Sequence, residues 1–415
     1  MKTKWDAVVV GAGAAGYFCA LQLAEQKPEW SIAIMEQSNK TLSKVKVSGG
    51  GRCNVTNGET RNKVFLEGYP RGAAHLKTLF QRFGPQATKE WFQKAGLDLV
   101  AEADGRMFPR QNTSQAVIDL FERRASQSGI QIFRSHALLA LTSGDEECQI
   151  SLKSASGEMK WEARYVVLAM GGVHKESVWE PLKGLELTRV PSVPSLFTFQ
   201  VQDPELQALS GLSVPQARVW MQGDKRRFDG PLLITHWGLS GPAILKASAF
   251  LARELAQREY TFTAHINFLG SEWGEQSCMD SLRLHAQTHA DKQLKNAVPF
   301  GLPARLFAFI LSKLGKAEHS KWSELGPTQQ RRLIENLVNY QAHCKGKTTF
   351  KEEFVTAGGV ALSELDKDGS LRKYPRIWVV GEMLDIDGMT GGYNFQAAWT
   401  TAWAAAEGIA ARESN

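Results

Sequence analysis

The feature that most constrains this chain is a glycine pattern between a buried strand and a helix near the N-terminus. Residues 6–10 (DAVVV) form a short, β-branched apolar run, typical of a strand buried on both faces of a parallel sheet. Residues 11–16 (GAGAAG) follow directly, and residues 17–26 continue with apolar positions at helical spacing. This order of strand, tight turn and helix predicts an α/β fold that begins with a nucleotide-binding unit.

The three glycines of this turn have separate structural tasks. Gly11 allows the tight turn, Gly13 lets a pyrophosphate approach the backbone, and Gly16 lets the helix pack close to the strand. The helix N-terminus adds amide donors and the positive end of a dipole. A second strand at residues 31–35 ends at Glu36, whose carboxylate suits the hydroxyls of a ribose without a 2′-phosphate. The pattern predicts a dinucleotide site and leaves NAD and FAD both open.

The uncharged stretch at residues 7–24, preceded by two lysines, resembles a signal peptide. Its glycines argue against that interpretation, because a strand, a turn and a helix require them and an apolar span does not. The five cysteines are odd in number, widely spaced and without a C-x-x-C pair, so we expect neither disulfides nor a zinc site. His285 and His289 lack a third ligand, so no metal is predicted. We expect a protein of the reducing cytoplasm with no membrane contact.

The charge balance bears on the partners of the chain. Lysine and arginine number 49 against 43 aspartate and glutamate residues, a net charge of +6, and the basic residues are dispersed. Nucleic-acid binders gather such residues on one face or along one helix. The composition therefore predicts no nucleic-acid partner, and it leaves the oligomeric state open.

Three later segments favour a flavin over a nicotinamide. Residues 44–57 (KVKVSGGGRCNVTN) form a glycine-rich loop that allows close backbone approach to a flat or anionic ligand, with a ligand-free surface loop as the alternative. Residues 165–172 (YVVLAMGG) form another buried strand that runs into a glycine pair. Residues 377–382 give a strand followed by an acid, and residues 391–406 a glycine-opened helix. A long cofactor such as FAD, clasped by both ends of the chain, would use all three.

The chain resembles the glutathione-reductase-like FAD fold and, within it, the bacterial flavoproteins related to aminoacetone oxidase and the BaiN-type (YhiN-like) bile-acid reductases. The resemblance covers nearly the whole chain. It is carried by residues 48–57 (SGGGRCNVTN), 104–109 (DGRMFP), 233–245 (LITHWGLSGPAIL), 356–360 (TAGGV) and 381–396 (GEMLDIDGMTGGYNFQ). Residues 366–375 differ from the sequence that is usual in this family.

The resemblance implies an FAD site that runs from the first glycine turn to the C-terminal helix. It assigns the pyrophosphate to the first turn and Arg52, the adenosine ribose to Glu36 and the adenine to backbone at Ala137 and Leu138. The predicted FAD contacts are Gly11, Gly13, Ala14, Ala15, Gly16, Glu36, Gln37, Lys44, Ser48, Gly50, Arg52, Cys53, Asn54, Ala137, Leu138, Ala169, Gly171, Gly381, Glu382, Gly391, Gly392, Tyr393 and Asn394.

The predicted fold class is α/β, with a Rossmann-like FAD-binding domain interrupted by an inserted β-rich domain and a small helical domain. The FAD-binding domain is predicted at residues 1–190 and 355–415. Alternating runs at 197–201, 217–220 and 260–264 predict a β-rich domain at 191–270, completed by residues 346–354. Helical spacing at 306–314 and 329–340 predicts a helical domain at 271–345.

These features predict an FAD-dependent oxidoreductase that passes hydride or electrons through flavin N5 to or from a small organic substrate. Reduction by a transiently bound NAD(P)H and reduction by an amine both remain open. Tyr393, beside the flavin-side glycines, and His236, in an inserted segment, are the candidate catalytic residues, and for each a packing role is the alternative. Cys53 is a candidate redox partner of the flavin, or a packed side chain. A flavin-binding redox sensor or RNA-associated protein without turnover is the alternative function.

Overall fold

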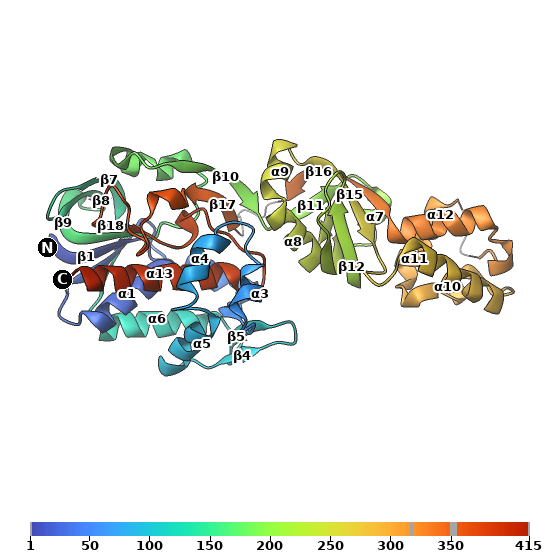
Figure 1. Cartoon of the computed structure of the whole chain (residues 1–415), viewed down its shortest axis with the longest axis horizontal. Helices are drawn as coiled ribbons and strands as arrows, with labels where there is room; N and C mark the ends of the chain where they lie inside the picture. The colour runs from blue at the N-terminus through green and yellow to red at the C-terminus, as the bar shows by residue number, and fades with distance from the viewer. Residues whose placement is uncertain (1, 316–318, 349–354, 414–415) are drawn as a thin grey trace. The chain divides into compact units, whose positions relative to one another are not determined.

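In the computed structural model, the N-terminal β-branched run forms the centre of a seven-stranded sheet (Figure 1). Strand β1 (Lys4–Val10) pairs in parallel with β2 (Ile32–Glu36) on one side and with β9 (Gly157–Leu168) on the other. Strands β6 (Gln131–Arg134) and β18 (Ile377–Val379) continue the parallel arrangement at its two ends. The structure describes residues 2–315, 319–348 and 355–413. The predicted Rossmann arrangement is confirmed, and its sheet contains strands from both ends of the chain.

The two faces of this sheet have different coverings. Ala7 and Val9 pack in one hydrophobic core with helices α1 (Ala14–Gln26), α6 (Gln115–Gln127) and α13 (Tyr393–Arg412). Val8 and Val10 point to the other face and share a second core with Trp161. Because both faces are covered, the central strand is continuously apolar and buried from Ala7 to Val10 rather than alternating.

Smaller elements complete this unit, which comprises residues 1–193 and 355–415. Strands β7 (Ala137–Ser143) and β8 (Cys148–Ser154) pair antiparallel beside the first part of β9. A separate sheet contains β3 (Thr56–Asn57), β5 (Arg106–Pro109) and β4 (Leu99–Ala101), and β10 (Arg189–Ser195) pairs with β17 (Val355–Val360). The short helices are α2 (Ser43–Gly51), α3 (Asn62–Leu66), α4 (Ala73–Leu79) and α5 (Pro85–Lys94).

The second unit comprises residues 194–354 and is built on a closed barrel. Its strands follow the order β11 (Thr198–Val201), β14 (Gly238–Ser240), β13 (Phe228–Thr235), β12 (Ser213–Met221), β15 (Thr261–Asn267) and β16 (Tyr340–Thr348). Along β15, buried Phe262, Ala264 and Ile266 alternate with outward polar residues. This alternation is the pattern that predicted the strands, and the inserted β-rich region is confirmed.

The helical part of this unit shares its core with the barrel. Helices α7 (Pro204–Gln207), α8 (Pro242–Phe250) and α9 (Ala252–Gln257) lie within the barrel segment, and α10 (Glu275–Thr288), α11 (Ala304–Lys313) and α12 (Pro327–Val338) form the helical region. Leu306 and Leu333 belong to the same hydrophobic cluster as Phe199 and Ile266 of the barrel. The stretches predicted as two inserted domains therefore form one compact unit.

Parts of the predicted domain ranges lie outside the described residues, namely 1, 316–318, 349–354 and 414–415. Among the residues that the structure does describe, no helix has the length and apolar character to cross a membrane.

Candidate functional site

The first glycine turn shows why each of its glycines is needed. A Cβ on Gly11, whose φ is +113°, would lie 2.3 Å from the carbonyl oxygen of Ala169. A Cβ on Gly16 would lie 1.9 Å from the carbonyl oxygen of Gly11, so the helix can approach the strand only without one. A Cβ on Gly13 would meet no protein atom within 4 Å. The fold itself therefore requires Gly11 and Gly16, whereas the space beside Gly13 is free for a ligand.

The acid at the end of β2 lies against the same turn. One oxygen of Glu36 accepts a hydrogen bond from the backbone N–H of Ala12 at 3.0 Å, and the other from Ser38 N–H at 2.9 Å. The carbonyl of Glu36 accepts from His136 N–H at 2.8 Å, which brings the start of β7, with Ala137 and Leu138, beside the carboxylate. Gln37 follows Glu36 and is exposed. The residues predicted to hold adenosine thus come from neighbouring backbone segments.

The glycine-rich loop forms a kinked helix rather than an irregular loop. Within α2, Ser48 leaves the helical conformation, and Gly49 and Gly50 are left-handed with φ of 56° and 69°. Gly51 is left-handed as well, at 83°. A Cβ on Gly50 or Gly51 would meet nothing within 4 Å, so this kink, like Gly13, presents open backbone.

Next to this kink, Cys53 and Asn54 are buried and Arg52 is ion-paired. Burial raises the pKa of the Cys53 thiol to about 12, so the sulfur is protonated near neutral pH. Asn54 accepts a hydrogen bond from Met107 N–H at 3.2 Å. Arg52 pairs with Glu102 at 2.7 Å and lies over the ring of Phe108 at 4.0 Å. In this structure Arg52 is therefore committed to the β4–β5 hairpin.

A lysine and a glutamate from opposite ends of the chain meet beside the last strands. The ammonium of Lys44 lies 2.6 Å from one carboxylate oxygen of Glu382, and the other oxygen accepts from Thr356 N–H at 3.0 Å. A Cβ on Gly172 would lie 3.0 Å from that second oxygen, whereas one on Gly171 would meet nothing within 4 Å. This cluster combines the two segments expected to flank the flavin.

The C-terminal glycines are pressed against the glycine-rich segment. A Cβ on Gly392, with φ of 93°, would lie 2.3 Å from the carbonyl oxygen of Thr56. Asn57 donates to the carbonyl of Gly391 at 3.1 Å. Asn394 bonds to both backbone groups of Gly388, at 2.9 and 2.8 Å, which fixes the turn that opens α13. The free amides of this helix therefore start beside residues 54–57.

The first turn also touches the C-terminal segment. A Cβ on Gly381 would lie 2.8 Å from the Cβ of Ala15, and Gly381 N–H donates to the Thr401 hydroxyl at 2.9 Å. Ala14 and Ala15 begin helix α1, directly after the open backbone at Gly13. Both ends of the chain thus border one region of the first unit, as the prediction of a shared cofactor requires.

The two predicted catalytic residues have different surroundings. The ring of Tyr393 is 6% exposed and stacks on Phe65, with centroids 4.3 Å apart and planes 9° apart. Burial raises the pKa of its hydroxyl to about 12. His236 lies in the second unit, in the turn between β13 and β14, with its ring 4.6 Å from that of Trp237. All the predicted FAD contacts belong to the first unit, and His236 is the predicted residue that does not.

Two polar clusters of the first unit escaped the sequence patterns. Asp387, fully buried, forms a bidentate ion pair with Arg71. Gln396, also fully buried, joins the Thr56 hydroxyl at 2.6 Å to that of Thr88 at 2.8 Å. In each cluster the bonded residues are more than 300 positions apart in the chain, so no local spacing indicated these contacts. The sequence offered one hint, a polar glutamine at position 396 within an alanine-rich helix.

The open glycines test whether these residues fit an extended dinucleotide. A Cβ on Gly13, Gly50, Gly51 or Gly171 would meet no protein atom within 4 Å, and these glycines occur in three separate segments. An acid that suits a ribose lies beside the first, and a lysine and a helix N-terminus lie near the others. One acid for the ribose, backbone amides at the glycine turn for the pyrophosphate, and the lysine with the helix N-terminus for the ring system fit the parts of FAD.

Comparisons with known proteins agree with this fit. The family described as the HI0933-like protein Rossmann domain matches residues 5–408. The ribosomal RNA dihydrouridine synthase of Escherichia coli is 28% identical over 422 aligned positions, covering 99% of this chain and 100% of that protein. The 3-dehydro-bile acid delta(4,6)-reductase of Clostridium scindens is 26% identical, covering 97% and 98%. The solved 3-ketosteroid delta1-dehydrogenase of Sterolibacterium denitrificans has a TM-score of 0.53 at 14% identity, covers 99% of this chain and 100% of its own, and shows a common fold.

Proposed function

Because this chain belongs to the HI0933-like family of Rossmann-domain proteins and is an FAD-dependent oxidoreductase, we propose that it reduces a carbon–carbon double bond conjugated to a carbonyl group. The names of two full-length relatives support this reaction. Dihydrouridine is uridine with its C5=C6 bond saturated, and that bond is conjugated to the C4 carbonyl. A delta(4,6)-reductase of a 3-dehydro bile acid saturates bonds conjugated to the 3-oxo group.

The substrate that we propose is a uracil base in ribosomal RNA. The observation that carries this choice is the alignment of a ribosomal RNA dihydrouridine synthase with 99% of this chain, inserted unit included. A small conjugated ketone is the second candidate, favoured by the bile-acid reductase. An RNA substrate departs from our charge-based expectation of no nucleic-acid partner, which considered only the overall count of charges and their spread along the sequence.

In the proposed site, the residues of the first unit hold and orient the cofactor. The amides around Gly13 and the start of α1 would hold the pyrophosphate, and Glu36 would hold the ribose. The N-terminus of α13 would offer amide donors and a positive dipole end to the ring system, with Lys44 and Glu382 at its edge. When bound, FAD supplies hydride transfer at its N5 atom. The other FAD contacts named from the sequence would surround the rest of the cofactor.

The overall reaction balances with NAD(P)H as the proposed electron donor. One hydride and one proton add across the C5=C6 bond of uracil, and NAD(P)H becomes NAD(P)⁺. The sequence contains a single G-x-G-x-x-G pattern, so the donor would bind transiently rather than in a second dinucleotide domain. His236 and Tyr393 are the two candidates for the donor of this one proton, and at neutral pH the buried hydroxyl of Tyr393 carries its proton.

The test begins with anaerobic mixing of the FAD-loaded protein with NADH, NADPH or aminoacetone while the flavin absorption is followed. We expect bleaching by a nicotinamide; bleaching by aminoacetone alone would contradict the proposal and indicate an amine oxidase. The protein is then incubated with NAD(P)H and unmodified ribosomal RNA, and the nucleosides are analysed by mass spectrometry. A uridine that gains two hydrogens supports the RNA substrate. Reduction of a conjugated ketone with unchanged RNA would favour the second candidate.

A further inference from the structure

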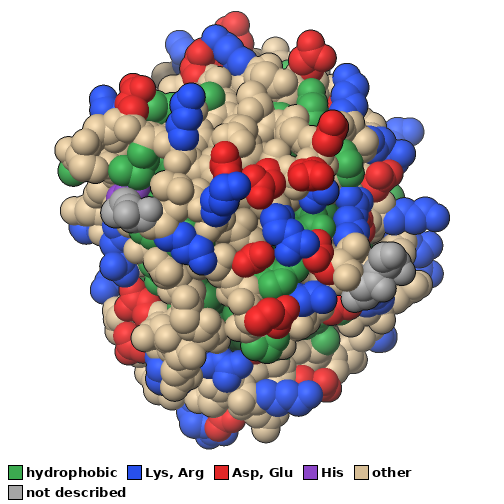
Figure 2. Space-filling view, turned by 90° about the vertical axis from the view of Figure 1, so that its left-hand side faces the viewer, with side chains coloured by type: hydrophobic (Ala, Val, Ile, Leu, Met, Phe, Trp, Pro, Cys, Tyr) green, Lys and Arg blue, Asp and Glu red, His purple; other side chains and the backbone are tan. Residues whose placement is uncertain are grey.

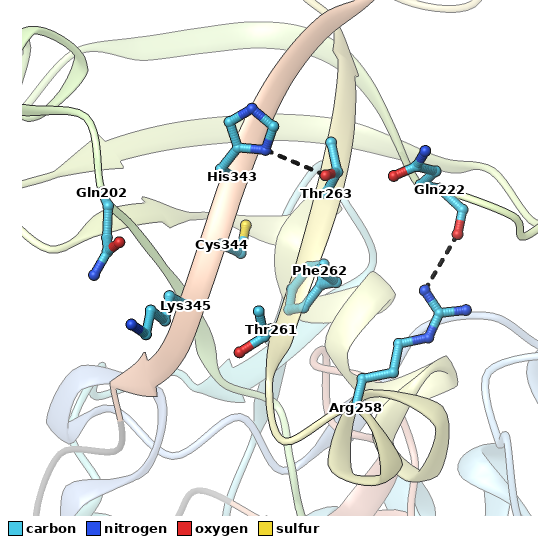
Figure 3. A pocket seen from close by; sticks show the side chains of 9 residues that line it. All are labelled: Gln202, Gln222, Arg258, Thr261, Phe262, Thr263, His343, Cys344 and Lys345. Carbon is cyan, nitrogen blue, oxygen red and sulfur yellow. Dashed lines mark hydrogen bonds between the residues drawn. The ribbon is translucent and has the colours of Figure 1, made fainter.

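The outer face of the barrel in the second unit is hollowed between neighbouring strands. A pocket of about 370 Å³ lies over β15 and β16 (Figure 3). Its polar lining includes Gln202, Gln222, Arg258, Thr263, His343 and Lys345. Among the described residues that line it, two are permanent cations and none is acidic. Such a hollow suits an anionic ligand.

Backbone hydrogen bonds make the residues around this pocket a continuous rim. Gln222 N–H donates to the carbonyl of Thr263 at 3.0 Å, and Gln202 N–H donates to the carbonyl of His343 at 3.3 Å. His343 also contacts the Thr263 hydroxyl at 3.3 Å (Figure 3). The next link is Val201 N–H, which donates to the carbonyl of Trp237 at 3.1 Å. This bond joins the turn that carries Trp237 to β11, one residue before Gln202; Trp237 itself is not among the residues that line the pocket.

Trp237 is unusually open for a large aromatic residue. Its side chain is 42% exposed, and it is the only aromatic among the exposed large hydrophobic residues that the structure describes. An exposed indole on the turn next to β11 offers a flat surface on which a base can stack. His236 lies beside it, with ring centroids 4.6 Å apart.

Among the residues that the structure describes, no acid forms an ion pair with either cation of the pocket. Within the described parts of the chain, neither Arg258 nor Lys345 forms an ion pair, and Arg258 donates only to the backbone carbonyl of Gln222 at 3.4 Å (Figure 3). Other cations of the same unit are paired: Arg218 with Asp229 at 2.7 Å, for example. On the face of the first unit in Figure 2, lysines and arginines likewise lie among acidic residues. Among the described residues, the barrel thus has two cations without an ion pair in this pocket and an exposed indole on the turn beside β11.

We propose that this rim, defined as Gln202, Trp237, Arg258, His343 and Lys345, binds a single-stranded segment of RNA, an inference that rests on the proposed RNA substrate. Arg258 and Lys345 contact phosphates, and Trp237 stacks on a base. A barrel face that combines cations with a stacking aromatic residue is a general means of holding unpaired strands. The rim thereby anchors the strand that presents the target base.

The first experiment measures binding of a labelled, uridine-rich single-stranded RNA to the full-length FAD-loaded protein at several salt concentrations. The variant Arg258→Gln/Lys345→Gln removes two phosphate contacts. We expect the slope of log K against log salt to become shallower by about 1.4, and affinity in about 0.1 M salt to fall roughly 25-fold. The control Lys292→Gln/Lys295→Gln makes the same charge change at exposed positions of the helical region, and we expect the salt slope and affinity of the wild type.

The second experiment tests the stacking surface. Trp237→Ala should weaken binding roughly 5- to 150-fold, whereas Trp237→Phe, which keeps a flat ring, should retain most of the affinity. Both substitutions leave the backbone carbonyl at position 237 and its hydrogen bond in place. Equal losses in the two variants would contradict stacking.

Several results would overturn the rim proposal. The first two are no RNA binding by the wild type and unchanged binding by the Arg258→Gln/Lys345→Gln variant. The others are that the wild type binds a fully paired RNA duplex, or a polyglutamate peptide, as tightly as it binds the single-stranded RNA. FAD content and the rate of flavin reduction by NAD(P)H are measured for every variant. If the double variant reduces uracil and keeps full RNA affinity, the rim proposal is refuted and the proposed function stands. If RNA binding depends on the rim but uracil is not reduced, the rim proposal stands and the proposed function is refuted.

Discussion

The open space beside Gly13 allows the cofactor site to be tested without disturbing the fold. Gly13 has φ of −90° and ψ of −169°, which any residue can adopt, and an added Cβ would meet no protein atom within 4 Å. Gly13→Ala should therefore keep or slightly raise the stability of the FAD-free protein, by about 0.4–1 kcal/mol, because it restricts the unfolded chain. The same methyl group would occupy space that the pyrophosphate needs. Crowding of about 1–3 kcal/mol corresponds to a roughly 5- to 150-fold weaker affinity for FAD.

Gly16→Ala is the matched control, because it makes the same chemical change three residues away. Its Cβ would lie 1.9 Å from the carbonyl oxygen of Gly11, and backbone cannot move aside cheaply. We expect this variant to lose about 3 kcal/mol or more of folding free energy, with or without FAD. The two variants should therefore separate loss of cofactor from loss of fold.

The assay combines urea unfolding of the FAD-free proteins with titration of FAD, followed by flavin fluorescence and by the rise in melting temperature that a ligand of the folded state produces. A Gly13→Ala protein that binds FAD as tightly as the wild type would refute the phosphate assignment. A Gly13→Ala protein as unstable as Gly16→Ala would refute the argument from free space.

Three further predictions concern groups elsewhere in the two units. Asp387→Asn should lower the free energy of unfolding by about 3–5 kcal/mol, measured in urea, because it removes the charge of a fully buried carboxylate from its bidentate pair with Arg71. A loss below about 1 kcal/mol would mean that water reaches the site. Burial alone would raise the pKa of Asp203, but hydrogen bonds from the start of α7 and from β16 outweigh it, so the pKa is lowered. The ionised carboxylate therefore stabilises the fold above a pH of about 4, and this stabilisation is lost as the pH falls through the folded-state pKa. Asp203→Asn should thus cost about 1–2 kcal/mol at neutral pH and progressively less in acid, and a difference independent of pH would contradict this. All five cysteines are buried, and burial raises the pKa of Cys53 to about 12. The folded protein should therefore resist thiol alkylation near pH 8 and react fully after unfolding. Rapid labelling of Cys53 in the folded state would make it a redox candidate again.

Local pattern was sufficient for the elements that the sequence predicted. The run at residues 6–10, the alternation along residues 260–264 and the helical spacing at 306–314 depend on neighbours only a few residues apart, and each became the expected element. Some helices begin at a different residue from the one predicted, because a capping residue sets the start. Helix α1 begins at Ala14 instead of residue 17, with Gly13 as its N-cap. The kink inside α2 was predicted only as a glycine-rich loop, since consecutive left-handed residues carry no periodic signal.

The sequence by itself determined the nucleotide-binding unit, its family resemblance and the kind of structure in each inserted segment, because glycine requirements and side-chain periodicity are local properties. Only the tertiary structure decided that the inserted strands and helices share one core, that Lys44 meets Glu382 across 338 positions, and that Arg258 and Lys345 line one hollow. Those contacts depend on the path of the chain, which brings together residues with no pattern in common. Their energies arise from burial and charge pairing after the chain has closed, so no window of sequence contains them.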